Sequence, residues 1–190
     1  MKYLIVYAHP NEKSFNHAVL EQVETILKNA GKEYAVRDLY AMRFNPVLDR
    51  KDLSMLLEGQ TAKEVEKEQR LVEEAQVIIF IYPIWWFGMP AIMKGYIDRV
   101  FVQGFAFAIE ENGLKGLLTG KKVIMINTTG SPRDLLVQTG YEDAMKKTAE
   151  TGIFEFCGMD VAAHRYLYAV PYADDAARKR MLEELKRIDF

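Results

Sequence analysis

Three short apolar runs, separated by helical patterns, restrict the possible folds of this chain most strongly. They are residues 3–8 (YLIVYA), 77–82 (VIIFIY) and 122–127 (KVIMIN). Each run is nearly continuous, as expected for strands buried on both faces. Weaker strand patterns span 34–39 and 161–170, and helical spacing fills 15–30, 49–74, 90–101, 141–151 and 174–188. Strands that alternate with helices predict a parallel sheet with helices on both faces.

The number of strands suggests their order in the sheet. Five strands in 190 residues predict an α/β, flavodoxin-like, doubly wound five-stranded parallel sheet of order 2-1-3-4-5. The length suits one domain over residues 1–190. In such sheets, ligands bind beyond the carboxyl ends of the strands, near the switch point between the first and third strands. The residues that follow the three strong strands are therefore the candidates for a binding site.

Composition argues against several other classes of protein. The formal net charge of -2 gives no electrostatic reason to expect nucleic-acid binding. The single cysteine, Cys157, cannot form an internal disulfide, which favours a reducing cytoplasm. No run approaches the roughly 20 apolar residues of a membrane helix, the N-terminal run has no signal-peptide cleavage site, and no spacing of side chains suggests a metal site. We expect a cytoplasmic protein without membrane insertion.

A polar segment, residues 9–16 (HPNEKSFN), follows the first strong strand and leads into a helix. Free backbone N–H groups and the helix dipole attract anions at such a helix start. His9, Ser14 and Asn16 can add side-chain donors to a phosphate. Ser14 is equally suited to act as the N-cap of the helix, which requires no ligand. The chain has no phosphate-binding P-loop motif and no G-x-G-x-x-G motif.

An aromatic segment, residues 82–90 (YPIWWFGMP), follows the next strong strand and holds both tryptophans of the chain. Loops run over the surface, and three adjacent aromatic side chains cannot all point into the core. Trp85, Trp86 and Phe87 beside Gly88 therefore predict a platform for the isoalloxazine ring of a flavin. Packing of these aromatics into the core is the alternative.

Small residues follow the third strong strand, at 128–131 (TTGS). Thr128, Thr129, Gly130 and Ser131 leave room for a ring edge to approach, and their N–H and hydroxyl groups can stabilise negative charge on a reduced flavin. Taken alone, this segment is equally compatible with a plain turn. Its place beside the other two clusters favours the flavin interpretation.

These segments resemble the NAD(P)H:quinone oxidoreductases, the DT-diaphorase family, and in particular its short bacterial members. The matching stretches are HPNEKSFN, DLYAMRFNPVLDRKDL, EQRLVEEAQVIIFIYPIWWFGMPAIMKGYIDRVFVQGFAF, TTGS and FEFCGMD. The most specific of them is the P-x-x-W-F-G-x-P-A-x-x-K-G run. The resemblance implies a homodimer with its active site at the subunit interface. It also implies a flavin, NAD(P)H as co-substrate, and two-electron, ping-pong reduction of quinones or similar acceptors.

The resemblance also implies roles for single residues. Those at the flavin phosphate and ribityl chain are His9, Phe15 and Asn16. Those at the flavin ring are Pro83, Ile84, Trp86, Phe87, Thr128, Thr129 and Gly130, and those lining the substrate pocket are Trp86, Phe107 and Phe156. Arg178 matches a position near the adenine end of FAD, which favours FAD over FMN.

Two positions depart from the animal members of this family. Leu136 and Glu142 stand where those enzymes carry a tyrosine and a histidine that assist hydride transfer. No catalytic side chain is therefore assigned, and the flavin itself carries the chemistry. The physiological acceptor and the choice between NADPH and NADH do not follow from the sequence.

Two other functions compete with the enzyme. A regulatory flavoprotein, ancillary to a potassium efflux system, would retain the same motifs. A one-electron flavodoxin fits less well, because flavodoxins are strongly acidic and lack the WWFG segment.

The remaining notable residues receive structural interpretations. We expect His17 to be exposed, His164 to be structural, Cys157 to be a buried thiol, and the charged residues 63–70 to form a solvated helix face. The segment 90–107 is apolar on too many sides for a surface helix, which predicts a partner subunit.

Overall fold

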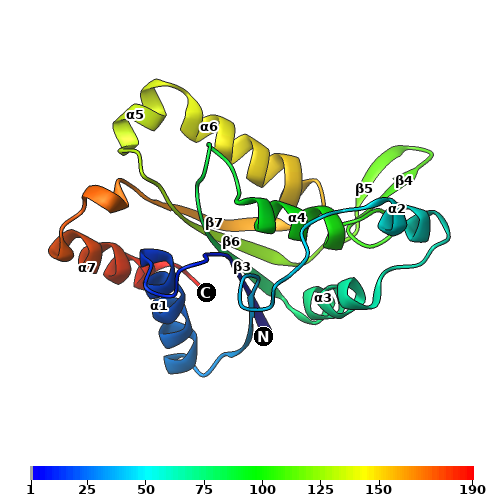
Figure 1. Cartoon of the computed structure of the whole chain (residues 1–190), viewed down its shortest axis with the longest axis horizontal. Helices are drawn as coiled ribbons and strands as arrows, with labels where there is room; N and C mark the ends of the chain where they lie inside the picture. The colour runs from blue at the N-terminus through cyan, green and yellow to red at the C-terminus, as the bar shows by residue number, and fades with distance from the viewer. Residues whose placement is uncertain (1) are drawn as a thin grey trace.

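The computed structural model describes residues 2–190 and contains a five-stranded parallel sheet (Figure 1). Its strands are β1 (Lys2–Tyr7), β2 (Glu33–Asp38), β3 (Val77–Pro83), β6 (Lys122–Thr128) and β7 (Asp160–Leu167). They lie in the order β2-β1-β3-β6-β7, so the predicted order 2-1-3-4-5 is confirmed when the strands of this sheet are counted along the chain. The three strong apolar runs form its three central strands, β1, β3 and β6.

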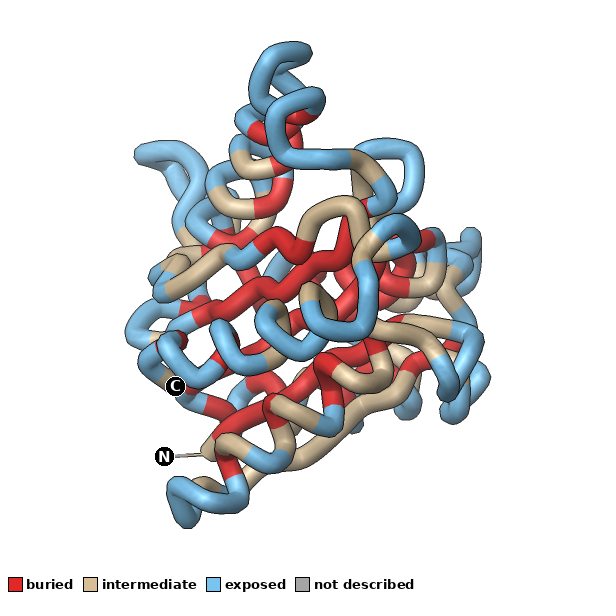
Figure 2. Tube along the Cα trace, turned by 90° about the vertical axis from the view of Figure 1, so that its left-hand side faces the viewer, coloured by how far each residue is buried: buried red, intermediate tan, exposed pale blue. Residues whose placement is uncertain are grey.

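Helices cover both faces of the sheet. On one face α1 (Phe15–Asn29), α7 (Asp175–Glu184) and the 3-10 turn η3 (Leu185–Arg187) pack over Tyr3, Ile5 and Ile79. On the other face α3 (Lys63–Glu74), α4 (Ala91–Val100) and the π-helix η1 (Lys147–Glu155) pack over side chains such as Leu4 and Phe80. Successive strand residues alternate between these two cores, which explains why the central strands are apolar throughout. Figure 2 shows the buried strands between helices whose outer sides are exposed.

Several elements differ from the expected ones. The predicted break near Gly59 is present, between α2 (Arg50–Leu57) and α3. The helix expected over 141–151 begins as α6 (Tyr141–Lys146), but continues as the π-helix η1 (Lys147–Glu155). The last helix is also divided, into α7 and η3. The sequence patterns missed the helix α5 (Arg133–Gln138), the short turn η2 (Val170–Tyr172) and the hairpin of β4 (Phe107–Glu110) with β5 (Gly113–Gly116).

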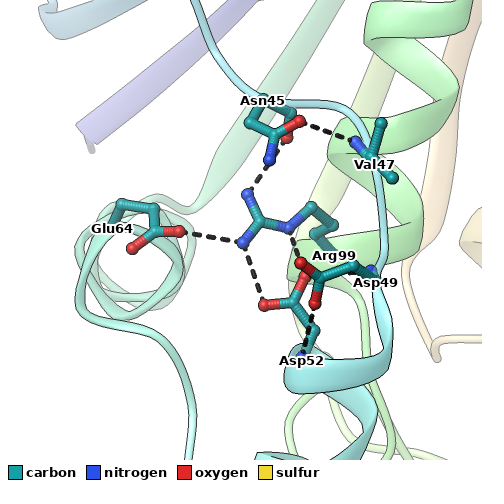
Figure 3. Close-up of polar contacts among 6 residues, drawn as sticks. All are labelled: Asn45, Val47, Asp49, Asp52, Glu64 and Arg99. Atoms are coloured by element: carbon teal, nitrogen blue, oxygen red, sulfur yellow. Dashed lines mark hydrogen bonds and ion pairs between the residues drawn. The ribbon is translucent and has the colours of Figure 1, made fainter.

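Buried ion pairs attach the peripheral elements to this core. The expectation of a fully solvated face over 63–70 was wrong at Glu68, which is buried and accepts hydrogen bonds from Arg37 at 2.9 and 2.5 Å. On α4, buried Arg99 donates to both carboxylate oxygens of Asp52 at 2.8 and 3.0 Å, and to Glu64 at 2.9 Å (Figure 3). Because α2 buries none of its own residues, the ion pair of Asp52 with buried Arg99 is a specific link between α2 and the core.

Within residues 2–190, no helix combines the length and the apolar character that a membrane span requires.

Candidate functional site

The carboxyl ends of β1, β3 and β6 bring the three predicted clusters together. Pro83 and Thr128 are register partners at the end of the β3–β6 pair, and the amide of Ile84 donates to the Thr128 carbonyl at 2.8 Å. The Asn16 amide, at the start of α1, donates to the Thr128 hydroxyl at 2.7 Å. The segment after β1 and the segments after β3 and β6 therefore form one continuous surface.

The start of α1 supplies polar groups on the β1 side of this surface. Ser14 is the N-cap of α1, and its hydroxyl accepts a hydrogen bond from the amide of His17 at 3.1 Å. Its side chain therefore has the capping role that requires no ligand. Asn16 is 4% exposed, and its Oδ1 finds no hydrogen-bond partner in the described chain. His9 lies beside Trp85, with ring centroids 6.1 Å apart. Burial lowers the pKa of His9, opposed by its backbone hydrogen bond to Asn11.

The aromatic segment after β3 forms a tight, strained turn. The backbones of Trp85 and Gly88 exchange hydrogen bonds of 3.1 and 3.0 Å. Both central residues, Trp86 and Phe87, have positive φ angles of 50° and 58°. Such turns normally place Asn or Gly at these positions, and bulky residues there are strained. Strain of this kind gathers at functional sites.

The side chains of this turn project away from the core. Trp86 is 98% exposed, and Trp85 and Phe87 are also exposed, so the alternative of core packing was wrong. Phe87 stacks on Tyr141, with ring centroids 3.8 Å apart and an interplanar angle of 12°. This stacking fixes one edge of the turn and leaves the Trp86 ring free to contact a ligand.

A hollow of about 270 Å³ lies between this turn and the residues after β6. Its walls are Trp86 and Phe87 on one side and the segment 129–131 on the other, and Leu136 is buried beneath it. The combination of exposed aromatics, small facing residues and an unpartnered Asn16 oxygen fits a flat ring joined to a polar chain. Phe87 and Ile84 also line a second hollow of about 260 Å³ on the side facing α6.

Comparison with known proteins identifies the family of this chain. A family model described as "Flavodoxin-like fold" matches residues 1–188. An NAD(P)H oxidoreductase of Haemophilus influenzae is 35% identical over 184 residues, covering 96% of this chain and 91% of that protein. Rat NAD(P)H dehydrogenase [quinone] 1 is 33% identical, covering 97% of this chain and 74% of the rat protein. The chain belongs to the flavodoxin-like NAD(P)H:quinone oxidoreductase family.

A solved structure supports this membership. The NAD(P)H:quinone oxidoreductase of Methanothermobacter marburgensis superposes with a TM-score of 0.87 at 29% identity, covering 98% of this chain and 96% of that one. The shared fold therefore extends over nearly the whole length of both oxidoreductases.

Arg178 lies on α7 and is linked to the hollow of this oxidoreductase through one intervening residue, Val170. Its Nη2 donates to the carbonyl of Val170 at 3.4 Å, and its buried Nε makes no hydrogen bond within residues 2–190. The amide of Val170 in turn donates to the carbonyl of Thr129 at 3.0 Å. Arg178 is thus connected to the β6 end of the site through the η2 segment.

The predicted substrate pocket does not form within one chain. Phe107 and Phe156 pack against each other with ring centroids 5.2 Å apart. Phe107 lines a separate groove of about 900 Å³ between α2 and the end of α4, whereas Trp86 lines the hollow beside the β6 end.

Glu142 is buried and surrounded by hydrogen-bond donors and positive charges. It accepts hydrogen bonds from Lys146 at 2.7 Å and from the Tyr168 hydroxyl at 2.8 Å. Although burial favours the neutral acid, these hydrogen bonds and the nearby positive charges keep the pKa of Glu142 below its usual value. Burial, together with Glu142, raises the pKa of Tyr168 to about 12. Glu142 is therefore a carboxylate at neutral pH, and Tyr168 is a neutral phenol.

Of the two other histidines, only His17 differs from its expected surroundings. His17 is half-buried, not exposed, and its ring meets that of Tyr7 at a centroid distance of 6.0 Å. The side chain of His164 is only 4% exposed, as expected for a structural residue, with Asn127 and Glu150 each 2.7 Å from its ring nitrogens. The sequence analysis did not identify this group, although polar Asn127 at the end of the apolar run 122–127 was a signal that something polar faces it. Cys157 is buried as expected, and burial raises its pKa to about 11.

Proposed function

We propose that this chain is a cytoplasmic, flavin-dependent NAD(P)H oxidoreductase that reduces quinones or similar acceptors by two electrons. The main support is the strained turn, which holds Trp86 and Phe87 across a hollow from the small residues 129–131. The names of the relatives, NAD(P)H oxidoreductase and NAD(P)H dehydrogenase [quinone], support the same activity. The single free thiol, Cys157, is compatible with a reducing cytoplasm.

The site residues would hold a flavin in three parts. Trp86, Phe87, Pro83 and Ile84 would contact one side and edge of the ring, and Thr128, Thr129, Gly130 and Ser131 would face it from the β6 end. His9, Ser14, Phe15 and Asn16 would hold the ribityl and phosphate side. When bound, the flavin accepts a hydride from NAD(P)H and then passes two electrons to the acceptor.

The protein contributes electrostatics without an ionisable catalytic side chain. Leu136 is buried beneath the hollow, and Glu142 is engaged with Lys146 and Tyr168. The Thr129 amide already donates to the Leu167 carbonyl at 2.9 Å, so the backbone amides of Gly130 and Ser131 are the groups available to stabilise negative charge at the ring edge.

FAD is the cofactor we favour over FMN. The buried Nε of Arg178 is without a partner in the described part of the chain, and the η2 segment joins Arg178 to the ring end of the site. Asp175 lies 3.7 Å from Nη1 of Arg178, and a cofactor that extends past the first phosphate would give the remaining Nε an acceptor.

A homodimer would complete the substrate pocket. The apolar character of residues 90–107 is only partly a reason to expect a partner subunit, because Met93, Val100 and Phe101 are buried in the chain's own core. A stronger reason is the groove of about 900 Å³ between α2 and α4, which is lined by exposed Leu53 and Leu57 and ends at Phe107. In a symmetric pair, Phe107 and Phe156 of one subunit would face the Trp86 turn of the other.

Flavin titration followed by steady-state turnover tests this function. Protein prepared without flavin should quench the fluorescence of added FAD or FMN at one equivalent per chain. The loaded protein should oxidise NADH or NADPH in the presence of menadione. Absence of flavin binding would contradict the proposed site. Flavin binding without nicotinamide oxidation would contradict the enzyme and favour a regulatory role.

A further inference from the structure

Three side chains from different elements form a hydrogen-bonded relay beneath the site, buried at Asn127 and partly exposed at Glu150. Glu150 on η1 lies 2.7 Å from Nδ1 of His164 on β7, and Nε2 of His164 lies 2.7 Å from Oδ1 of Asn127 on β6. Asn127 is fully buried, and its Nδ2 donates to the Tyr82 carbonyl at 3.3 Å. The relay therefore runs from the outer helix layer, through the sheet, to the end of β3.

The polarity of these bonds determines where protons must lie. The Tyr82 carbonyl can only accept, so the Asn127 amide must direct its Nδ2 toward β3 and its Oδ1 toward His164. Nε2 of His164 must therefore carry a proton. The Nδ1 lone pair and a Glu150 carboxylate cannot face each other at 2.7 Å without a second proton between them. The His164–Glu150 pair thus shares a proton.

The far end of the relay lies directly before the Trp86 turn and the segment 128–131. Tyr82 is followed by Pro83 and the strained turn, and Asn127 is followed by Thr128. The Ile84 amide closes the same gap by donating to the Thr128 carbonyl at 2.8 Å. If the Asn127 amide rotated, its Oδ1 would face the Tyr82 carbonyl, and this junction would be repelled.

We propose that His164 is a positioning residue for the flavin site. Together with Glu150 it fixes the Asn127 amide, which joins the ends of β3 and β6 and so sets the spacing between the Trp86 turn and the segment 129–131. The expected effect on flavin binding rests on the proposed function, whereas the hydrogen bonds of the relay involve only residues of this chain. Burial lowers the pKa of His164 and Glu150 opposes that shift. Lys146 and Glu142 are the other charged groups that face the imidazole.

Substitutions of Glu150 separate hydrogen-bond polarity from packing. Glu150→Gln supplies an N–H that can donate to Nδ1 of a neutral His164, so the tautomer and the Asn127 orientation are preserved. Glu150→Leu leaves Nδ1 without a partner and frees the ring to change tautomer. Glu155→Leu, on the exposed side of the same helix, is the matched control. His164→Phe removes the relay while keeping a planar ring.

Two readouts decide the proposal. Both tryptophans of the chain lie in the turn, so near-ultraviolet circular dichroism and acrylamide quenching report its geometry without any flavin. Flavin dissociation constants are measured on the same proteins, corrected for the folded fraction. We expect Glu150→Leu and His164→Phe to alter the tryptophan signals and to weaken flavin binding about tenfold or more, the effect of a buried group left without its hydrogen bond. Glu150→Gln should stay within about threefold of the original protein, and Glu155→Leu should match it.

Other results would overturn the inference. Unchanged tryptophan signals and flavin affinity in Glu150→Leu and His164→Phe would show that the relay does not set the turn. Equal losses in Glu150→Gln and Glu150→Leu would show that charge or packing, not hydrogen-bond polarity, is responsible. If the original protein binds no flavin, the proposed function fails, and the tryptophan signals alone still decide whether His164 positions the turn.

Discussion

Two properties of Trp86 allow its effect on flavin affinity to be measured separately from its effect on the free energy of unfolding. Its side chain is 98% exposed, so it adds no buried area, and its φ of 50° strains the backbone. Trp86→Gly should therefore leave the free energy of unfolding unchanged or raise it by about 1 kcal/mol. Flavin affinity should fall about tenfold or more if the indole contacts the ring. Urea unfolding and flavin titration measure the two effects.

Arg43→Gly provides a matched control for this substitution. Arg43 is also exposed with a φ of 50°, but it lies in the loop after β2. It should show the same change in stability with no change in flavin affinity. A Trp86→Gly protein that binds flavin normally would remove the indole from the site.

Cys157 should be chemically inert in the folded protein. It is 3% exposed, and burial raises its pKa to about 11, so both access and thiolate formation are suppressed at neutral pH. We expect a disulfide reagent such as DTNB to label it at least about 100-fold more slowly in the folded state than in urea. Rapid stoichiometric labelling without unfolding would show that the thiol is accessible.

At the scale of elements, α2 is attached through charge, which can be tested by substitution and by pH. Hydrogen bonds from Arg99 lower the pKa of Asp52. The stabilisation is therefore fully present above the unfolded value near 3.9 and is lost as the pH falls through the lower folded value. Asp52→Asn should reduce the free energy of unfolding by about 3 kcal/mol, because it leaves Arg99 buried with one partner fewer. It should also flatten the acid side of the stability curve.

Asp98→Asn is the control for the α2 substitution. Asp98 pairs with Lys94 on the exposed side of α4 at 2.6 Å, where such pairs contribute about 0.5 kcal/mol or less. Chemical denaturation between pH 2 and 7 measures both proteins. Equal, small losses would mean that Arg99 does not anchor α2.

The elements differ in how well the sequence could predict them. Continuous apolar runs such as 77–82 identify buried parallel strands, and the topology rule then brings the segments after them to one edge. The π-helical winding from Lys147 was not predictable from a pattern of 3.6-residue spacing. Local patterns also could not reveal the positive φ angles of the Trp86 turn. The relay escaped prediction because Asn127, Glu150 and His164 meet only when three separate elements pack.

At the scale of the whole molecule, the groove between α2 and α4 predicts a dimer that charge should disrupt. Leu57 is 90% exposed at this groove. We expect light scattering to give about twice the chain mass of 21.9 kDa, and Leu57→Glu to shift the protein toward the monomer because a buried charge opposes association. Tyr172→Glu, an exposed site on the η2 turn, should remain dimeric. A monomeric original protein with full activity would contradict the dimer.

If the site is shared between subunits, two inactive variants should restore each other. Trp86→Gly damages the ring-contacting turn, and Phe107→Ser damages the wall that the partner would supply, so each homodimer should lose most of its quinone reductase activity. A mixed dimer contains one site with both defects and one site with neither. Because random pairing of two chains makes half of the dimers mixed, co-expression in equal amounts should recover about a quarter of the original activity. Co-expression of the original chain with the doubly substituted chain gives mixed dimers whose two sites each carry one defect, so those dimers should contribute almost no activity. If separately tagged mixed dimers of the two single variants remain inactive, Trp86 and Phe107 serve the same chain's site and the shared site is contradicted. An active Phe107→Ser homodimer would show that Phe107 has no part in the site.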